Sequence, residues 1–239
     1  MKIKTHSVRS GVSAARRTFP RVKNPAFCRK PLHWFCRSLE ICALCVLTAS
    51  AITVLAAPET FNFKDPKRVN NVSYRLDAPL EAVNGNANGI SGTVTFDPEN
   101  PSATKGKIIV ASASLMGPNS MQNEHMHSAM WLDVAKYPEI TFDCKELKNV
   151  KTSGDTTTAD AVGAFTLKGV SREMTIPVKL TYLKDKLGER VPNQQGDLLV
   201  IRSNFSIKRS DFNIQPGRME DKVSNEIDLT LSIAGASPK

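Results

Sequence analysis

The segment 156–183, TTTADAVGAFTLKGVSREMTIPVKLTYL, has the clearest structural pattern in the chain. In its second half apolar side chains occupy every second position: Met174, Ile176, Val178, Leu180 and Tyr182. A period of two is typical of a β-strand with one buried face. Residues 156–167 form a similar run, and the short stretch 168–171 between the two runs predicts an antiparallel hairpin. Pro177 lacks an amide donor, which predicts an edge or a bulge at that position.

Further short runs of this kind lie on both sides of the hairpin and are separated by Gly, Pro, Asn and Asp. They predict strands at 61–63, 72–77, 92–96, 107–115, 140–145, 199–207 and 223–233. The glycines of segment 84–92, NGNANGISG, are expected to permit bends or bulges. About eight strands without a βαβ rhythm predict an all-β fold. Because antiparallel edges need closure, we expect an antiparallel β-barrel.

The segment 119–138, NSMQNEHMHSAMWLDVAKYP, does not have the strand pattern. Asn119 and Ser120 can cap a first turn, no Gly or Pro interrupts the following residues, and Pro138 ends the run. Met126, Met130 and Val134 recur at a spacing of four, which predicts a helix with one apolar stripe. We expect this single helical insertion to cover the mouth of the barrel.

The first 57 residues differ in composition from the rest of the chain. They contain ten of the 32 basic residues and one acid, Glu40, which leaves 22 basic and 22 acidic residues in 58–239. The predicted domain 58–239 therefore has no basic excess for binding nucleic acid. The basic leader is followed by an apolar run, 41–57, which predicts a secretory signal cleaved near Ala56 or Ala57 and a periplasmic or secreted protein. The alternative is an uncleaved signal that anchors the protein in a membrane.

Cysteine and motif content argue against catalysis in 58–239. Four of the five cysteines lie in the leader, so Cys144 has no partner within 58–239 for a disulfide. Its place in the alternating run 140–145 predicts an inward thiol that acts as a small buried hydrophobe. No nucleophile elbow, phosphate loop or Cys/His pair is recognisable, and we predict that the protein is not an enzyme.

A group of methionines and histidines suggests an alternative function, copper binding by an exported protein. It comprises Met116, Met121, His125, Met126, His127 and Met130. On a helix, His125 and His127 diverge by about 200°, which disfavours a shared ion. Methionine as a flexible filler of gaps is the favoured interpretation, and no metal site is predicted.

Several motifs occur in the order found in one known family. They are FSIKRSDFNI at 205–214, GAFTLKGVSR at 163–172, and the segment 114–142 with its EHM, LDV and KYPEITF pieces. Together they resemble the YceI-like polyisoprenoid-binding proteins over about 60–235. Asn213 stands where the family prefers Gly, and both residues tolerate a left-handed backbone. The resemblance implies a lipocalin-like barrel that holds a long isoprenoid chain, such as a quinone tail, in an exported protein.

The resemblance makes the inward-facing side chains candidates for binding an isoprenoid lipid. They are Phe142, Phe165, Met174, Ile176, Leu180, Ile201 and Phe205, with Met130 and Trp131 as a lid. The alternative is that these residues simply fill the core of the barrel. Arg209 and Asp211 are expected to join a turn by a charge-assisted hydrogen bond. No cofactor is predicted other than a bound isoprenoid lipid or quinone, and transient contact with a membrane is expected.

Overall fold

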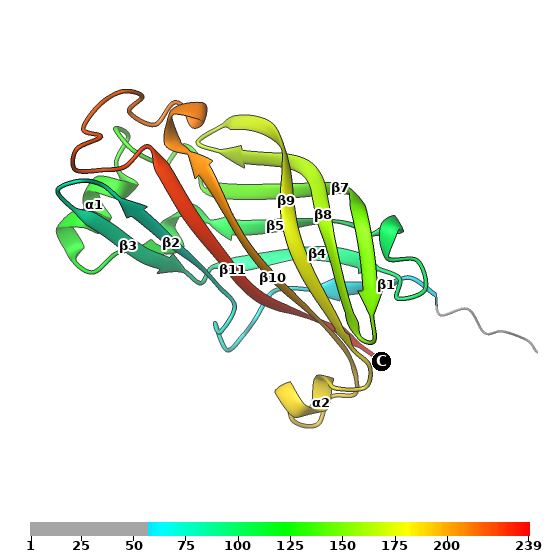
Figure 1. Ribbon diagram of the computed structural model, residues 1–239. Helices are drawn as coiled ribbons and strands as arrows, with labels where there is room; N and C mark the ends of the chain where they lie inside the picture. Colours follow the sequence, from blue (N-terminus) through cyan, green and yellow to red (C-terminus); the bar gives the residue numbers. More distant parts are fainter. Residues whose placement is uncertain (1–56) are drawn as a thin grey trace, which may run out of the picture. The chain divides into compact units, whose positions relative to one another are not determined.

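The computed structural model describes residues 57–239, which form one antiparallel sheet with short α-helices at its two ends (Figure 1). The strands are β1 (Glu59–Asn62), β2 (Asn71–Asp77), β3 (Ala82–Ala87), β4 (Ile90–Phe96), β5 (Lys105–Ala111), β6 (Leu115–Met116), β7 (Glu139–Ser153), β8 (Thr156–Leu167), β9 (Val170–Leu183), β10 (Gly196–Lys208) and β11 (Glu226–Pro238). The α-helices are α1 (Ser120–His127) and α2 (Leu187–Arg190), and 3-10 turns are η1 (Pro101–Ala103), η2 (Ser112–Ser114) and η3 (Arg209–Phe212).

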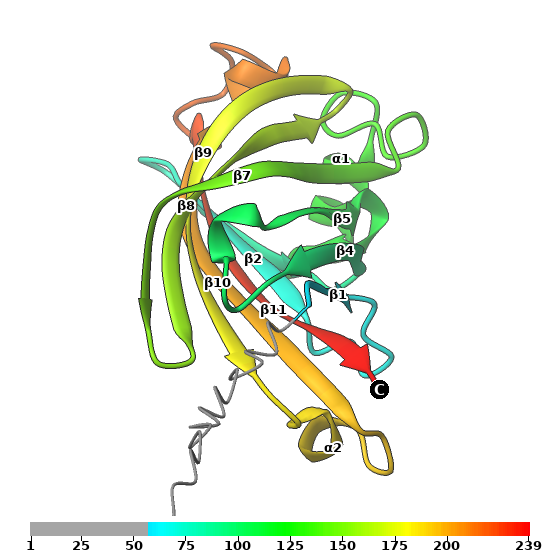
Figure 2. The same cartoon turned by 90° about the vertical axis from the view of Figure 1, so that its right-hand side faces the viewer.

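Eight of these strands close into a barrel. Their order is β1-β4-β5-β7-β8-β9-β10-β11, and β11 pairs with β1 through Ala236 and Asn62. Figure 2 shows the long strands β7 to β10 curving around the interior. The predicted all-β class and antiparallel barrel of about eight strands are confirmed.

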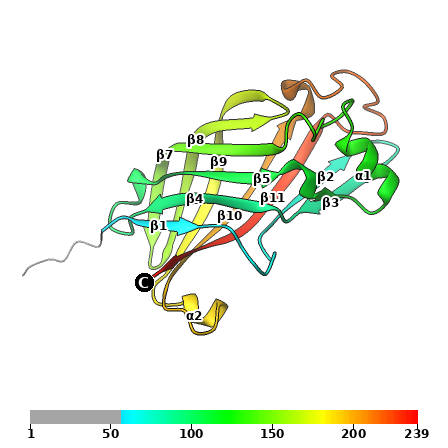
Figure 3. The same ribbon diagram turned by 180° about the vertical axis from the view of Figure 1, so that it is seen from behind.

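Strand β11 has two different partners on the side away from β10. Residues 228–232 pair with β2, whereas Ala236 pairs with β1. The β2–β3 hairpin and the short β6 therefore extend the wall at the end of the barrel that carries α1 (Figure 3). We call this end the mouth, and the end near β1 and α2 the base.

The β8–β9 hairpin forms as its sequence predicts. Leu167 pairs with Val170, and Lys168 and Gly169 between them both have positive φ angles of 48° and 74°. Two consecutive left-handed residues make the two-residue turn that matches the twist of a hairpin. Alternate β9 side chains from Met174 to Tyr182 are buried or half-buried, so the predicted apolar face is confirmed.

Pro177 lies close to the point where β9 separates from β10. The β9–β10 ladder ends at the pair Lys179 and Arg202, while β9 stays paired with β8 from Val170 to Thr181. The Ser203 hydroxyl donates to the Pro177 carbonyl at 2.6 Å. The Pro177 carbonyl therefore faces β10. Because the N–H and C=O of one strand residue point to the same side, the backbone N–H that proline lacks would also have faced β10.

The hydrophobic core consists of two clusters, one near the base of the barrel and one near the mouth. Around the base, Phe61, Phe63 and Phe96 are fully or almost fully buried, and Tyr182 contacts Phe61 and Phe96 with ring centroids 6.2 and 6.0 Å apart. A second cluster near the mouth contains Phe165 and Phe212, whose rings pack edge to face at 5.5 Å. Aromatic side chains thus close the base of the barrel.

Strand β3 is an element that the sequence interpretation missed. The stretch 84–87 was expected to bend as part of a Gly/Asn-rich passage, but it pairs with β2 and β6. A Cβ at Gly85 would collide with the Met116 carbonyl and the Tyr74 hydroxyl, so glycine allows the close approach of these strands. The predicted distortion is present at Gly92, whose φ is 112°.

The helical insertion is much shorter than predicted. The Asn119 side chain accepts from the Gln122 amide at 2.9 Å, which confirms the predicted cap, but α1 ends at His127. The Ser128 hydroxyl donates to the His125 carbonyl at 2.7 Å, and Asp133 has a φ of 52°, so the following residues form turns. The predicted stripe of Met126, Met130 and Val134 on one helix is therefore wrong.

Within 57–239, no helix has both the length and the apolar character that crossing a bilayer requires. The predicted signal segment and its cleavage near Ala56 precede or border the described residues, and the structure does not bear on them.

Candidate functional site

The barrel encloses a cavity of about 510 Å³. Four of its lining residues are exposed, and all of them lie at the mouth: Glu81, His125, Met219 and Lys222. Toward the base the lining ends with side chains such as Leu180, which pack in the same cluster as the buried Phe61 and Phe63. Within residues 57–239, the cavity is therefore blind toward the base and opens at the mouth.

Most of the lining is aliphatic or aromatic. Much of it comes from side chains that alternate along the strands, such as Ile176, Val178 and Leu180 of β9. Two hydroxyl groups of the deep lining already donate hydrogen bonds to backbone carbonyls: that of Ser203 to Pro177, and that of Thr104 to Pro101. The deep cavity consequently suits an apolar group.

Seven of the nine predicted ligand-binding residues line this cavity: Trp131, Phe142, Phe165, Ile176, Leu180, Ile201 and Phe205. Met174 packs against the cluster near the mouth but does not line the cavity. Met130 is 63% exposed, because it lies in the turns after α1 instead of on a helix face. Trp131 thus remains as the part of the predicted lid that faces the interior.

Polar side chains gather where the cavity opens. Tyr74 of β2 donates its hydroxyl to the Met126 sulfur of α1 at 3.4 Å. The side chains of Gln122 and Asn123 reach the same place, and the Asn123 Oδ1 accepts from the Gly117 amide at 2.6 Å. Sequence analysis did not select these residues, although Tyr74 lies on the alternating face of 72–77 and could have been found there.

Comparison with known proteins identifies the family. Residues 63–234 match the model of the YceI-like domain. The chain belongs to the YceI-like family.

Relatives and solved structures agree with this assignment. Protein YceI of Escherichia coli (strain UMN026) is 32% identical over 155 residues, which are 65% of this chain and 74% of that protein. BcnA of Burkholderia cenocepacia has a similar structure, with a TM-score of 0.57, 22% identity and coverage of 69% of this chain and 95% of that one. A polyisoprenoid binding domain from Saccharophagus degradans gives a TM-score of 0.56 at 10% identity, covering 76% of this chain and all of that one. At these identities the two structures support the fold alone.

The YceI-like motif around Arg209 has a structural role. Arg209 is 1% exposed, and its five guanidinium donors reach five backbone carbonyls, those of Ile214, Gln215, Arg218, Val223 and Ser224. The expected partner, the Asp211 carboxylate, is not among them, because the loop 213–224 turns its carbonyls toward the guanidinium. Asn213 has a φ of 55°, the left-handed conformation that the glycine of the family pattern favours. Arg209 therefore holds the loop that forms one side of the mouth.

The methionines and histidines of the copper hypothesis have different environments. Met116, Met121 and Met130 are 48%, 67% and 63% exposed, whereas Met126 lines the cavity. The His127 ring contacts the Leu115 carbonyl at 2.8 Å, and His125 lies at the opening. Among residues 57–239, no three His, Cys, Asp or Glu side chains are grouped in a way that could hold a metal ion.

Cys144 is a free thiol on β7 and lines the cavity, in agreement with its predicted inward position. Burial, together with the nearby carboxylates of Asp143 and Glu146, raises the pKa of this thiol to about 11. The thiol is therefore protonated at neutral pH and a weak nucleophile.

Proposed function

We propose that this YceI-like protein is a non-enzymatic carrier that binds a long isoprenoid chain, such as a quinone tail, inside its barrel. The observation that carries the proposal is the blind, largely apolar cavity with a single opening. A chain inserted from the mouth would lie with its apolar end toward the aromatic base. The description of the Saccharophagus degradans domain as polyisoprenoid binding supports this ligand class.

Burial of the ligand supplies enough free energy without any reaction. Apolar surface removed from water contributes roughly 25 cal/mol per Å², less the cost of ordering a flexible chain. The thiol in the lining, that of Cys144, has a raised pKa and stays protonated at neutral pH, which makes it a weak nucleophile. A binding role thus accounts for the features of the cavity.

A change inside the cavity tests the proposal. Ala161 of β8 is buried and lines the cavity, so Ala161→Phe should block the path of the chain. We expect lipid extracted from protein purified without detergent to fall at least several-fold relative to the unchanged protein, as measured by mass spectrometry. Filling a packed site costs about 1–3 kcal/mol, so thermal melting must show that the variant is folded.

The matched control is Ala164→Phe, on the same strand but at a position that alternates with the inward-facing ones. It should retain the lipid of the unchanged protein. Equal lipid content in the two variants, or an extract of unchanged protein that contains no lipid, would contradict the proposal.

We also propose that the protein is exported, with cleavage near Ala56 or Ala57 and residence in the periplasm or outside the cell. The basic leader and its apolar run support this. Amino-terminal sequencing of the protein from the periplasmic fraction would test it. A full-length chain recovered from the membrane fraction would instead favour the uncleaved anchor.

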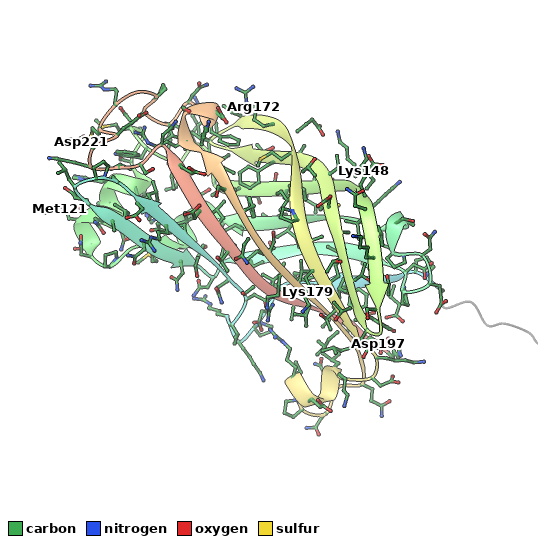
Figure 4. All side chains as sticks on the ribbon, viewed as in Figure 1. Met121, Lys148, Arg172, Lys179, Asp197 and Asp221 are labelled. Carbon is green, nitrogen blue, oxygen red and sulfur yellow. The ribbon has the colours of Figure 1, made fainter. Side chains whose placement is uncertain are left out.

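Exchange of lipid with a membrane is proposed to take place at the mouth. Five exposed large apolar side chains lie around it: Leu80, Met116, Met121, Met130 and Met219. The Leu80 amide donates to the Asp221 carbonyl, and the Met130 carbonyl accepts from Gln215, so these loops are connected at the mouth. Figure 4 shows Met121 and Asp221 at this end and Asp197 at the other. Such a ring of apolar side chains is suited to contact with a bilayer.

A further inference from the structure

Binding of an apolar chain does not account for one buried polar atom at the mouth. The Gln122 Oε1 atom is buried, but it has no hydrogen-bond partner among the described residues. A buried acceptor without a partner is energetically costly and calls for an explanation. Gln122 lines the cavity, so a molecule bound there could satisfy it.

Three polar atoms surround one open spot beside Gly117. Asn123 Oδ1, Gln122 Oε1 and the Tyr74 hydroxyl all lie within 3.5 Å of the position that a Cβ on Gly117 would occupy. The nearest of these contacts is 3.4 Å, which is ordinary van der Waals distance, so a methyl-sized group fits the spot. Gly117 itself lines the cavity.

Tyr74 can provide a second hydrogen bond at this spot. Among residues 57–239 its hydroxyl has one hydrogen-bond partner, the Met126 sulfur at 3.4 Å, and a thioether is a weak acceptor. Burial raises the pKa of the Tyr74 phenol, which therefore keeps its proton and can donate. Gln122 and Tyr74 together offer an acceptor and a donor.

The charges near the mouth do not favour a phosphate. The buried cation of the cavity lining, Arg209, directs all five donors to backbone carbonyls and has none left for a ligand. Lys222 lies on an exposed loop, and Glu81 provides an opposite charge in the same lining. A diphosphate would lose its hydration here without gaining the bidentate cation contacts that usually replace it.

We infer that Tyr74 and Gln122 form a binding subsite for an uncharged, hydroxyl-bearing head group of the isoprenoid ligand. This inference rests on the proposed function, because the blind cavity directs the chain inward and leaves the head at the mouth. The ligand hydroxyl donates to the Gln122 Oε1 and accepts from the Tyr74 hydroxyl. Prenyl alcohols, prenylated phenols and the reduced quinol form of a prenylated quinone have this chemistry, whereas oxidised quinones, prenyl diphosphates and plain hydrocarbons do not.

Three probes with related chains test the inference on protein freed of lipid: geranylgeraniol, geranylgeranyl diphosphate and the hydrocarbon phytane. The fluorescence of Trp131, which lines the cavity and is the single tryptophan of 58–239, reports binding. We expect geranylgeraniol to bind at least about tenfold more tightly than the diphosphate. Each hydrogen bond contributes about 0.5–1.5 kcal/mol, so Gln122→Leu and Tyr74→Phe should each weaken alcohol binding about 3–10-fold and leave phytane binding unchanged.

Matched controls are Glu124→Gln, on the exposed side of the same helix, and Tyr137→Phe, a tyrosine outside the cavity lining. Both should bind all three probes like the unchanged protein. Tighter binding of the diphosphate, or an equal loss of alcohol and phytane binding in the two test variants, would overturn the subsite while the carrier function stands. Failure of all three probes to bind would overturn the carrier function and the subsite with it.

Discussion

Cys144 shows how the barrel changes the chemistry of a single residue. Its thiol has a pKa of about 11 because it is partly buried and lies near two carboxylates. We expect the folded protein to react with a disulfide reagent much more slowly at pH 8 than the unfolded chain does. The rate should continue to rise above pH 9, where an ordinary thiol is already largely ionised.

The measurement uses residues 58–239, in which Cys144 is the single cysteine, and follows the reaction between pH 7 and pH 10.5. Because Cys144 lines the cavity, bound lipid should slow the reaction further. The same protein in concentrated guanidinium is the control. A folded protein that reacts as fast as the control would show that the thiol is not held in the cavity as described.

At the scale of elements, α1 and the loops around it form the proposed contact with membranes. Met121 on α1 and Leu80 in the β2–β3 turn are each 67% exposed. Replacing both with Glu places charge where apolar side chains would enter the interface. We expect binding to neutral phospholipid vesicles, measured by flotation, to fall several-fold.

Val69 provides a matched control for this prediction. It is 59% exposed, but it lies in the loop between β1 and β2, at the base of the barrel. Asp65 of the same loop forms a salt bridge with Arg190 of α2. Val69→Glu should leave vesicle binding unchanged. If Val69→Glu and the double variant reduced flotation equally, the contact would not be specific to the mouth.

The stability of the barrel depends on a buried carboxylate that connects the strands closing its base. Asp197 is fully buried; its carboxylate accepts from the Tyr182 hydroxyl at 2.5 Å and the Asp185 amide at 2.7 Å, and it pairs with Lys239 at 2.9 Å. Burial alone would raise the pKa of Asp197, but these hydrogen bonds outweigh it and lower the pKa to about 2. The ionised form is thus stabilised by folding.

This shift predicts how stability depends on pH. A carboxyl group with a lowered pKa contributes stability above its unfolded value of about 3.9, and that contribution is lost as the pH falls through about 2. Burial and the nearby Asp197 raise the pKa of Glu59, so its protonation adds stability as the pH falls toward its unfolded value of about 4.3, before the Asp197 contribution is lost. We expect Asp197→Asn to reduce the free energy of unfolding at pH 7 by about 2 kcal/mol and to flatten its decline between pH 4 and pH 2.

Urea unfolding at pH 7, 4 and 2.5 would measure both effects, with Asp155→Asn, an exposed turn residue, as the control. The control should have the stability and pH dependence of the unchanged protein. An Asp197→Asn variant as stable as this control at pH 7 would contradict the proposed role of the buried carboxylate.

The sequence alone determined those features that depend on neighbours along the chain. The alternation in 172–183 predicted one face of β9, and Lys168 with Gly169 could form the tight turn that this hairpin needs. The motif order identified the family and hence the barrel. Seven of the nine predicted site residues line the cavity because strand alternation already separates inward from outward positions; their contact with a ligand stays a prediction.

Features that depend on residues far apart in the sequence could not be predicted without the fold. The stretch around Gly85 became a strand because β2 and β6 pair with it, and α1 ended at His127 because the following residues turn toward the barrel. Tyr74 and Gln122 are 48 positions apart in the sequence, and although alternation places Tyr74 on an inward face, no local pattern indicates that the two residues meet. Their meeting at the mouth follows from the pairing of β3 with both β2 and β6, which brings the residues just before α1 beside Tyr74. Long-range pairing of this kind depends on the register of the whole sheet.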